Sequence, residues 1–326
     1  MTDRGTFPTF ADLLTREGAL SGTSWGLFPE ADRGTPSFIT PAAIVEARNS
    51  IRSGTVFGLD YPADAFDPGM SLKRSPPRHT IYSSHPAHRD DFLDGYYLQG
   101  SSQIDGLRHR RADDVGFYNG TPDALITEGT PDLGIQGWAE HPITGRGVVV
   151  DLDGFRRSLG EPIDHAAGEP LTLNLVQAAA AAQSLRLRPG DILMLHTGWC
   201  EWFLELTTAE KQQVRESRKA SGVEQSQEFV AWAWDQQLAL LAADNFALEC
   251  LPPVPDSPYR DSAPNDHGMM HQQLLAKLGT PLGELWRLGP LARHMRRTGQ
   301  WDAFISIKPL NITGGTGSPA NATAIT

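Results

Sequence analysis

The chain has 326 residues, a formal net charge of −11 and two cysteines, Cys200 and Cys250. The negative charge repels phosphate backbones and argues against a nucleic-acid partner, and two isolated cysteines exclude a disulfide framework or a Cys-x-x-Cys site. With 40% hydrophobic and 21% charged residues, the composition is that of a globular protein large enough to bury its own core. An apolar leader and a run of about 18 apolar residues are both missing, so we expect a cytoplasmic protein with no membrane partner.

Residues 1–90 are rich in Pro, Gly and Asp and predict mostly loop, with one helix from Pro41 to about Ser53. Beyond residue 91, strand and helix patterns alternate. We expect strands at Tyr96–Asp105, Gly147–Leu152, Ile192–Thr197, Phe246–Leu251 and Phe304–Ile307. We expect helices at Leu173–Leu185, Gln225–Leu241, His267–Leu278 and Leu285–Arg297. The alternation predicts an α/β fold, which we interpret as a single domain, 1–326, with a loop-rich interface region at 1–90 and a core at 91–326.

The segment from Tyr97 to His109 carries the densest group of polar side chains. If Tyr96–Asp105 is extended, four of them share one face of a strand: Gln99, Ser101, Gln103 and Asp105. Such a face, followed by a glycine and His109, is a candidate site. The solvated face of an edge strand is an equally compatible interpretation, and His109 could be an ordinary loop histidine among arginines.

These residues resemble the signature of the Putative cyclase family, which includes bacterial kynurenine formamidase and isatin hydrolase and reads His-x-Gly-Thr-His-x-Asp-x-Pro-x-His. Without gaps, Gln99 and Gln103 fall on the first two histidines, Asp105 on the aspartate and His109 on the last histidine. Further segments match in order: Gly145–Asp151, Gly190–Trp199, Ala243–Asn245 with Glu249, His271 with Glu284, and Gly314–Pro319. The resemblance implies the family's swivelling β/β/α fold, with a mixed sheet core and surrounding helices. It also implies a homodimer or homotetramer whose loops cross between subunits.

The resemblance also implies a divalent metal, Mn or Zn. In relatives the motif histidines and aspartate bind the metal, a later His and Glu can complete a second position, and the last motif histidine is the proposed base. Carried over, Asp105, His271 and Glu284 are candidate metal ligands. Gln99 and Gln103 depart from the pattern, and because an amide oxygen binds Zn less well than an imidazole, we expect weaker binding with a preference for Mn- or Mg-like ions.

The two glutamines can donate and accept hydrogen bonds, so they are candidate substrate contacts, together with Tyr118 in a segment typical of a variant branch of the family. We predict a hydrolase of a small amide, cyclic amide or lactone, with His109 as catalytic base and Asp105 as its catalytic partner. Two alternatives stay open: a metal-free lyase or cyclase that uses His109, and an inactive protein that binds a small molecule. The glycine-rich segment Gly314-Gly-Thr-Gly lacks the Gly-Lys-Ser/Thr of a phosphate-binding loop. We expect no organic cofactor.

Overall fold

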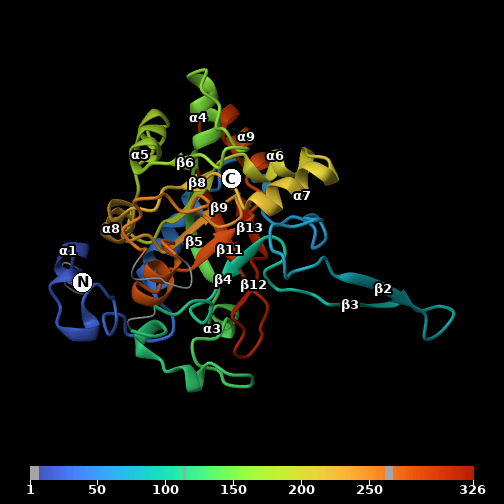
Figure 1. Cartoon of the computed structure of the whole chain (residues 1–326), viewed down its shortest axis with the longest axis horizontal. Coiled ribbons are helices and arrows are strands. Elements are labelled where there is room, and N and C mark those ends of the chain that lie inside the picture. The colour runs from blue at the N-terminus through green and yellow to red at the C-terminus, as the bar shows by residue number, and fades with distance from the viewer. Residues whose placement is uncertain (1–6, 113–114, 261–266) are drawn as a thin grey trace.

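The computed structural model describes residues 7–112, 115–260 and 267–326. Within them a nine-stranded sheet lies at the centre of the molecule, in the order β1-β13-β11-β5-β7-β9-β10-β4-β12 (Figure 1). Its strands are β1 (Val56–Gly58), β4 (Gln103–Asp105), β5 (Ile143–Asp151), β7 (Ile192–His196), β9 (Leu240–Ala243), β10 (Leu282–Glu284), β11 (Asp302–Ile307), β12 (Gly317–Pro319) and β13 (Ala322–Ile325). Strands β5, β7, β9 and β10 run parallel to one another, and the outer pairs are antiparallel. The expected α/β fold with a mixed sheet is confirmed.

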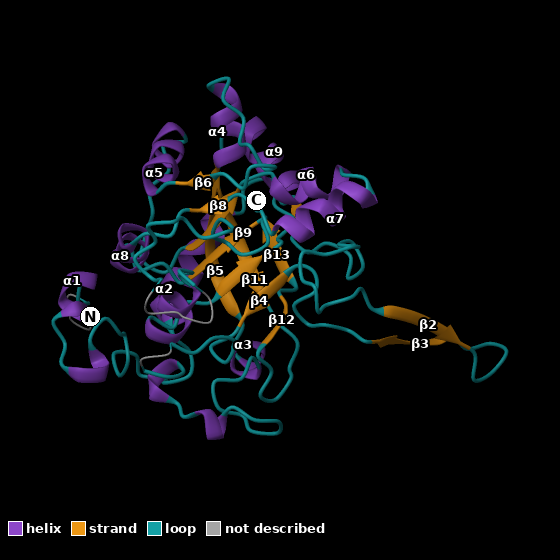
Figure 2. Ribbon diagram, viewed as in Figure 1, coloured by secondary structure: helices purple, strands orange, loops and turns teal. Residues whose placement is uncertain are grey.

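The helices surround this sheet (Figure 2). They are α1 (Phe10–Leu14), α2 (Pro41–Ala47), α3 (Gln136–Glu140), α4 (Leu152–Ser158), α5 (Leu173–Ala182), α6 (Trp199–Glu205), α7 (Thr208–Ser217), α8 (Gln227–Asp235) and α9 (Gly289–Thr298). Thr172 and Ser226 cap α5 and α8 with their hydroxyl groups, which is why these helices begin where they do. No helix in the described ranges combines the length and the apolar character that a membrane crossing needs.

Both faces of the central parallel strands are buried, which explains their continuous apolar sequences. Along β5, Val148 and Val150 belong to a core cluster shared with α5 and α8, whereas Val149 belongs to a second cluster shared with α9 and β11. Neighbouring residues of a strand point to opposite faces, so an uninterrupted Val-Val-Val run marks a strand covered on both sides.

A hairpin projects away from this body (Figure 1). Its strands β2 (Arg78–Tyr82) and β3 (Asp90–Asp94) pair antiparallel, and every residue of β3 is exposed. The sequence predicts loop over most of this region, because its apolar residues are few and widely spaced. A smaller parallel pair, β6 (Pro170–Leu171) and β8 (Gly222–Val223), lies near α5.

Several predicted boundaries are wrong. The expected strand Tyr96–Asp105 is extended only at Gln103–Asp105, because a turn closed by the Gly100 amide on the Tyr97 carbonyl, at 2.9 Å, interrupts it. The helix expected at Gln225–Leu241 ends at Asp235, and its last apolar residues form strand β9 instead. A short apolar run fits a buried strand as well as a buried helix, and the pairing with β7 decides between them.

Three further expectations need correction. Phe246–Leu251 is not a strand and contributes only isolated bridges, such as the one between Glu249 and Val223. The helix expected from His267 becomes a π-helical turn at Gln272–Lys277, which His271 precedes. The helix expected from Leu285 begins at Gly289, after β10. The strands expected near Ile192 and Phe304, by contrast, are confirmed as β7 and β11.

Candidate functional site

The candidate site is built on the short strand β4, which lies between β10 and β12. Gln103 pairs with Glu284 of β10, and Asp105 pairs with Leu282 of β10 and Gly317 of β12. Residues two apart share a strand face, so Gln103 and Asp105 point the same way while Ile104 lies in the core. The register of β4 against β10 therefore places an amide and two carboxylates together.

Asp105, His271 and Glu284 form a compact buried triad. Each offers a ligand atom, and these atoms all lie within 4.8 Å of one another. The imidazole nitrogen Nε2 of His271 lies 3.0 Å from Oε1 of Glu284 and 4.0 Å from Oδ2 of Asp105. On its other side, Glu284 Oε2 accepts a hydrogen bond of 2.6 Å from the amide of Gln103. The three predicted metal ligands are thus neighbours in space.

Glu249 fixes the orientation of His271 by bonding the ring nitrogen that faces away from Glu284 and Asp105. Its Oε1 accepts a hydrogen bond from His271 Nδ1 at 2.5 Å, and its Oε2 accepts the backbone N–H of Met270 at 2.7 Å. The bond fixes the ring so that Nε2 faces the two other carboxylates. The sequence alone predicts no role for Glu249 in the site. The available signal was its position as the lone acid within the apolar stretch Ala247–Leu251, since a buried carboxylate needs a partner.

The second half of the site joins Asp105 to His109 through Gln99. The Gln99 amide nitrogen donates to Asp105 Oδ1 and lies 3.0 Å from His109 Nδ1. Since an amide nitrogen only donates, Nδ1 is the acceptor and the ring proton lies on Nε2, which is 3.5 Å from Asp105 Oδ2. Gln99 packs directly on the backbone of Gly317, where a Cβ would lie 2.9 Å from its side chain.

The pKa values of the two histidines, His271 and His109, are shifted in opposite directions. Burial alone would lower the pKa of His271, but its hydrogen bonds to Glu249 and Glu284 outweigh burial and raise the pKa to about 10. For His109, burial and the positive charges of Arg110 and His271 lower the pKa to about 3. Near neutral pH, His271 is therefore a cation and His109 is a neutral ring able to accept a proton.

Burial also raises the pKa of the two carboxyl groups. For Asp105 the cause is desolvation, which the charge of His271 partly offsets, and for Glu284 the negative charge of Asp105 adds to the effect of burial. Two carboxylates crowded in a dry site favour a bound cation or proton. His271 supplies such a cation in this structure.

The donor set fits a divalent metal ion. It comprises one imidazole and two carboxylates, a combination found for Zn and Mn. The buried oxygens Asp105 Oδ2 and Gln103 Oε1 have no hydrogen-bond partner within the described residues. A buried acceptor left unpaired costs about 1–3 kcal/mol, a cost that a cation bound to Asp105 would relieve there. To bind through Nε2, His271 would have to release a proton.

The structure thus brings six of the predicted site residues together: Gln99, Gln103, Asp105, His109, His271 and Glu284. Tyr118 lies apart from them. Its side chain is buried in the core, and its hydroxyl lies 3.3 Å from Ser24 Oγ. Among the described interactions none links Tyr118 to the cluster, so its contact with substrate stays a prediction.

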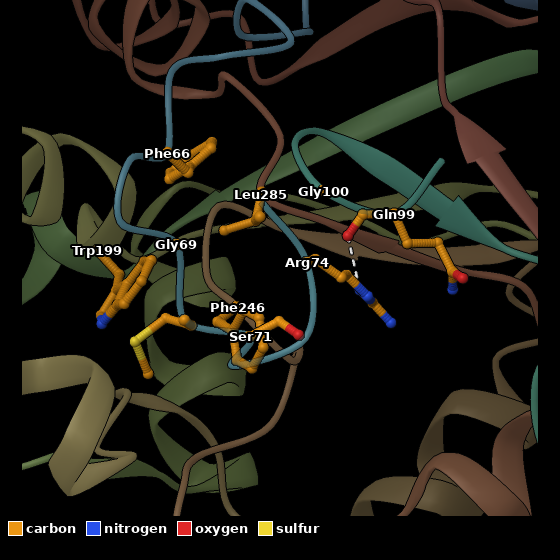
Figure 3. A pocket seen from close by; sticks show the side chains of 10 residues that line it. Phe66, Gly69, Ser71, Arg74, Gln99, Gly100, Trp199, Phe246 and Leu285 are labelled. Carbon is orange, nitrogen blue, oxygen red and sulfur yellow. Dashed lines mark hydrogen bonds between the residues drawn. The ribbon is translucent and has the colours of Figure 1, made fainter. Parts of the chain in front are cut away.

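An apolar recess lies beside Gln99 (Figure 3). Phe66 and Met70 line it from the loop that precedes the hairpin, and Trp199, Phe246 and Leu285 line it from the body. Its volume is about 10 Å³, enough for about one water molecule. The recess is therefore too small in this structure to hold a ring-sized group.

Solved structures of other proteins resemble this chain in sequence and in fold. No curated protein matches it in sequence. A crystal structure of a novel cyclase is 31% identical, with a TM-score of 0.79 over 93% of this chain and 99% of the other. Isatin hydrolase A from Labrenzia aggregata, bound to benzyl benzoate, is 14% identical, with a TM-score of 0.56 over 85% of this chain and 94% of the other. Isatin hydrolase A from Ralstonia solanacearum is 18% identical, with a TM-score of 0.55 over 87% and 95%.

The two isatin hydrolases share the fold of this chain, as their TM-scores and low identities indicate. The sequence profile of the family described as Putative cyclase matches residues 77–250, more than half of the chain. The matched segment contains β4, Gln99, Asp105 and His109. By its sequence and by its fold, the chain belongs to the Putative cyclase family.

Proposed function

We propose that the protein hydrolyses a small amide, cyclic amide or lactone. The observation that carries the proposal is the shared carboxylate of Asp105. One of its oxygens is bonded to the Gln99 amide that contacts His109, and the other lies near both His109 Nε2 and His271 Nε2. A proton acceptor and a cation-binding triad thus meet at one buried group. The names of the isatin hydrolases that share this fold also support hydrolysis, since isatin is a cyclic amide.

In the proposed reaction, His109 Nδ1 takes a proton from water as the water oxygen attacks the substrate carbonyl. Gln99, which donates to Nδ1 in this structure, must first turn away, and its freed amide can then donate to the carbonyl oxygen. The low pKa makes His109 a weak base, and the Asp105 carboxylate at 3.5 Å stabilises the imidazolium as it forms. When the C–N or C–O bond breaks, His109 returns the proton to the leaving atom.

Asp105, His271 and Glu284 are the residues that would hold a divalent ion, with Gln103 beside them. Such an ion supplies positive charge that polarises a carbonyl or makes a bound water more acidic. Glu249 orients His271 for this role. With two carboxylates and one imidazole, we expect Mn or Mg to be favoured over Zn.

The hairpin supports the expectation of a homodimer or homotetramer. Large apolar side chains are exposed on both of its faces, Ile81 and Leu93 on one and Tyr82 and Phe92 on the other. A lone two-stranded hairpin is only marginally stable in water, so we infer that a second copy covers it. Light scattering should show an oligomer that Ile81→Asp with Leu93→Asp weakens; a monomeric wild-type protein would contradict this. The single-domain organisation, the cytoplasmic location and the lack of an organic cofactor stay predictions.

A substrate screen tests the function. N-formyl-arylamines, isatin-like lactams and aryl lactones are incubated with metal-stripped protein and with protein supplied with Mn or Zn. Hydrolysis that EDTA abolishes and Mn restores supports the proposal in full. Turnover that survives EDTA indicates metal-free acid–base catalysis, either hydrolysis or the lyase reaction, which product analysis separates. Tight binding of a substrate without turnover would indicate an inactive binding protein.

A further inference from the structure

Arg74 is a cation at the edge of the site whose charge has no acidic partner in the described part of the chain. One terminal nitrogen donates to the backbone carbonyl of Gln99 at 2.6 Å, the only hydrogen bond that the side chain makes within the described residues. Figure 3 shows the guanidinium group against Gln99, with its second terminal nitrogen directed away from that carbonyl. Some half-buried arginines, such as Arg146 and Arg156, are paired with carboxylates. Others, such as Arg16, donate to backbone carbonyls as Arg74 does. Arg74 thus keeps donors free for a ligand.

Arg74 lies close enough to the site to act on it. Burial raises the pKa of Asp105 and lowers that of His109, and the positive charge of Arg74 makes a smaller contribution that lowers both values. Arg74 also belongs to the lining of the apolar recess, together with Gln99. In Figure 3 the aromatic side chains of Phe66 and Trp199 lie on one side of Arg74 and Gln99 lies on the other. The cation therefore lies between an apolar surface and Gln99.

The recess has the lining of a substrate pocket but is too small in this structure for a substrate. Phe66 and Met70 are almost fully buried, at 5% and 3% exposure, and both come from the loop that leads to Arg74. A cavity of about 10 Å³ holds no ring-sized group, so Phe66 and Met70 must shift for one to enter. Aromatic walls with one charged group at the rim are typical of sites that bind a small ligand and fix its orientation.

We propose that Arg74 binds a carboxylate of the substrate, and that the substrate class is a small amide or lactone that carries both an apolar ring and a carboxylate. This inference rests on the proposed hydrolase function. Without Arg74, the acidic residues of the site would repel an anion. A planar guanidinium matches a carboxylate with two parallel hydrogen bonds, and such charge-assisted bonds are stronger than neutral ones. Arg74 is therefore a residue that determines specificity.

Binding of two probes tests the inference without turnover. Benzoate and benzamide have nearly the same shape and differ in charge, and calorimetry measures their affinities for the wild type and for Arg74→Gln. We expect benzoate to bind the wild type at least about tenfold more tightly, and the preference to vanish in Arg74→Gln. Lys73→Gln is the matched control, because it removes an exposed charge from the neighbouring residue. It should keep the preference.

Two outcomes overturn the inference: a wild type with no preference for benzoate, and an Arg74→Gln variant that retains it. Rates with 4-formamidobenzoate and 4-formamidobenzamide separate the inference from the function. Equal kcat/KM for both substrates refutes the role of Arg74 and leaves the hydrolase intact. A benzoate preference with no hydrolysis of any compound in the substrate screen refutes the hydrolase and leaves the anion site. Hydrolysis of either compound releases formate. If Arg74 bound only this carboxylate product, Arg74→Gln would change the two rates equally, and that result also overturns the inference.

Discussion

Replacing Glu249 by glutamine keeps the shape of the side chain and removes the charge behind His271. In the wild type, both carboxylate oxygens are used, one by His271 Nδ1 at 2.5 Å and the other by the Met270 amide at 2.7 Å. Glutamine offers one oxygen, so one of these two donors must face an NH₂ group. The variant therefore tests whether Glu249 is the group that holds the ring for metal binding.

The expected magnitude follows from the bond that is lost. A hydrogen bond between ionised, fully buried partners contributes about 1.5–3 kcal/mol, which corresponds to a factor of about 10–150 in a dissociation constant. Loss of a carboxylate behind a metal-binding histidine typically weakens metal affinity by about 10–100-fold. The two ranges agree, so Glu249→Gln should weaken Mn binding by about 10–100-fold. The unpaired donor should also lower the free energy of unfolding by about 1–3 kcal/mol.

Calorimetric titration of metal-stripped protein with Mn measures the affinity, and urea unfolding measures the stability. Glu128→Gln provides the matched control, because it removes an exposed carboxylate from a surface turn and should change neither quantity by a measurable amount. An affinity within about threefold of wild type would refute the assigned role of Glu249, since that change is below the smallest effect expected. Absence of Mn binding in the wild type would refute the metal site itself.

Other changes test the remaining parts of the molecule. His109→Ala should lower kcat about 100- to 10,000-fold while circular dichroism stays unchanged, and wild-type rates in the variant would remove His109 from the mechanism. Gln99→His with Gln103→His should raise Zn affinity in calorimetry, because imidazoles replace two amides bonded to Asp105 and Glu284; an unchanged affinity would contradict the assigned geometry. At His196, burial alone would lower the pKa, but the charges and hydrogen bond of its acidic neighbours raise it from 6.5 to about 8. Protonated His196 therefore stabilises the fold below pH 6.5, and this contribution of about 2 kcal/mol is lost as the pH rises through 8. Urea unfolding measures the difference in the free energy of unfolding between wild type and His196→Gln. This difference should decrease by about 2 kcal/mol between about pH 6 and about pH 9, and a constant difference would contradict the raised pKa.

Short patterns of apolar and polar residues in the sequence were sufficient to predict several strands of the fold. The apolar run of β7 and the alternation of buried residues around Phe304 identify their strands without knowledge of any partner. The resemblance to the family assigns Asp105 and His109 to one site, and the structure places their side chains 3.5 Å apart. These features depend on residues that are neighbours in the chain, so their physical cause is present in the sequence itself.

The assembly of the site depends on contacts between residues that are distant in the chain. Gln99 reaches Asp105 through a turn and not along a strand face, which the alternation of side chains could not indicate. Glu249 meets His271 across 22 residues, and Gln103 meets Glu284 across 181, because strand register and a buried loop bring them together. The residue types, the local elements near them and the resemblance to a family can all be read from the sequence. The contact of Gln103 with Glu284 depends on the pairing of β4 with β10, a long-range choice set by burial of both sheet faces, which no short window of sequence contains.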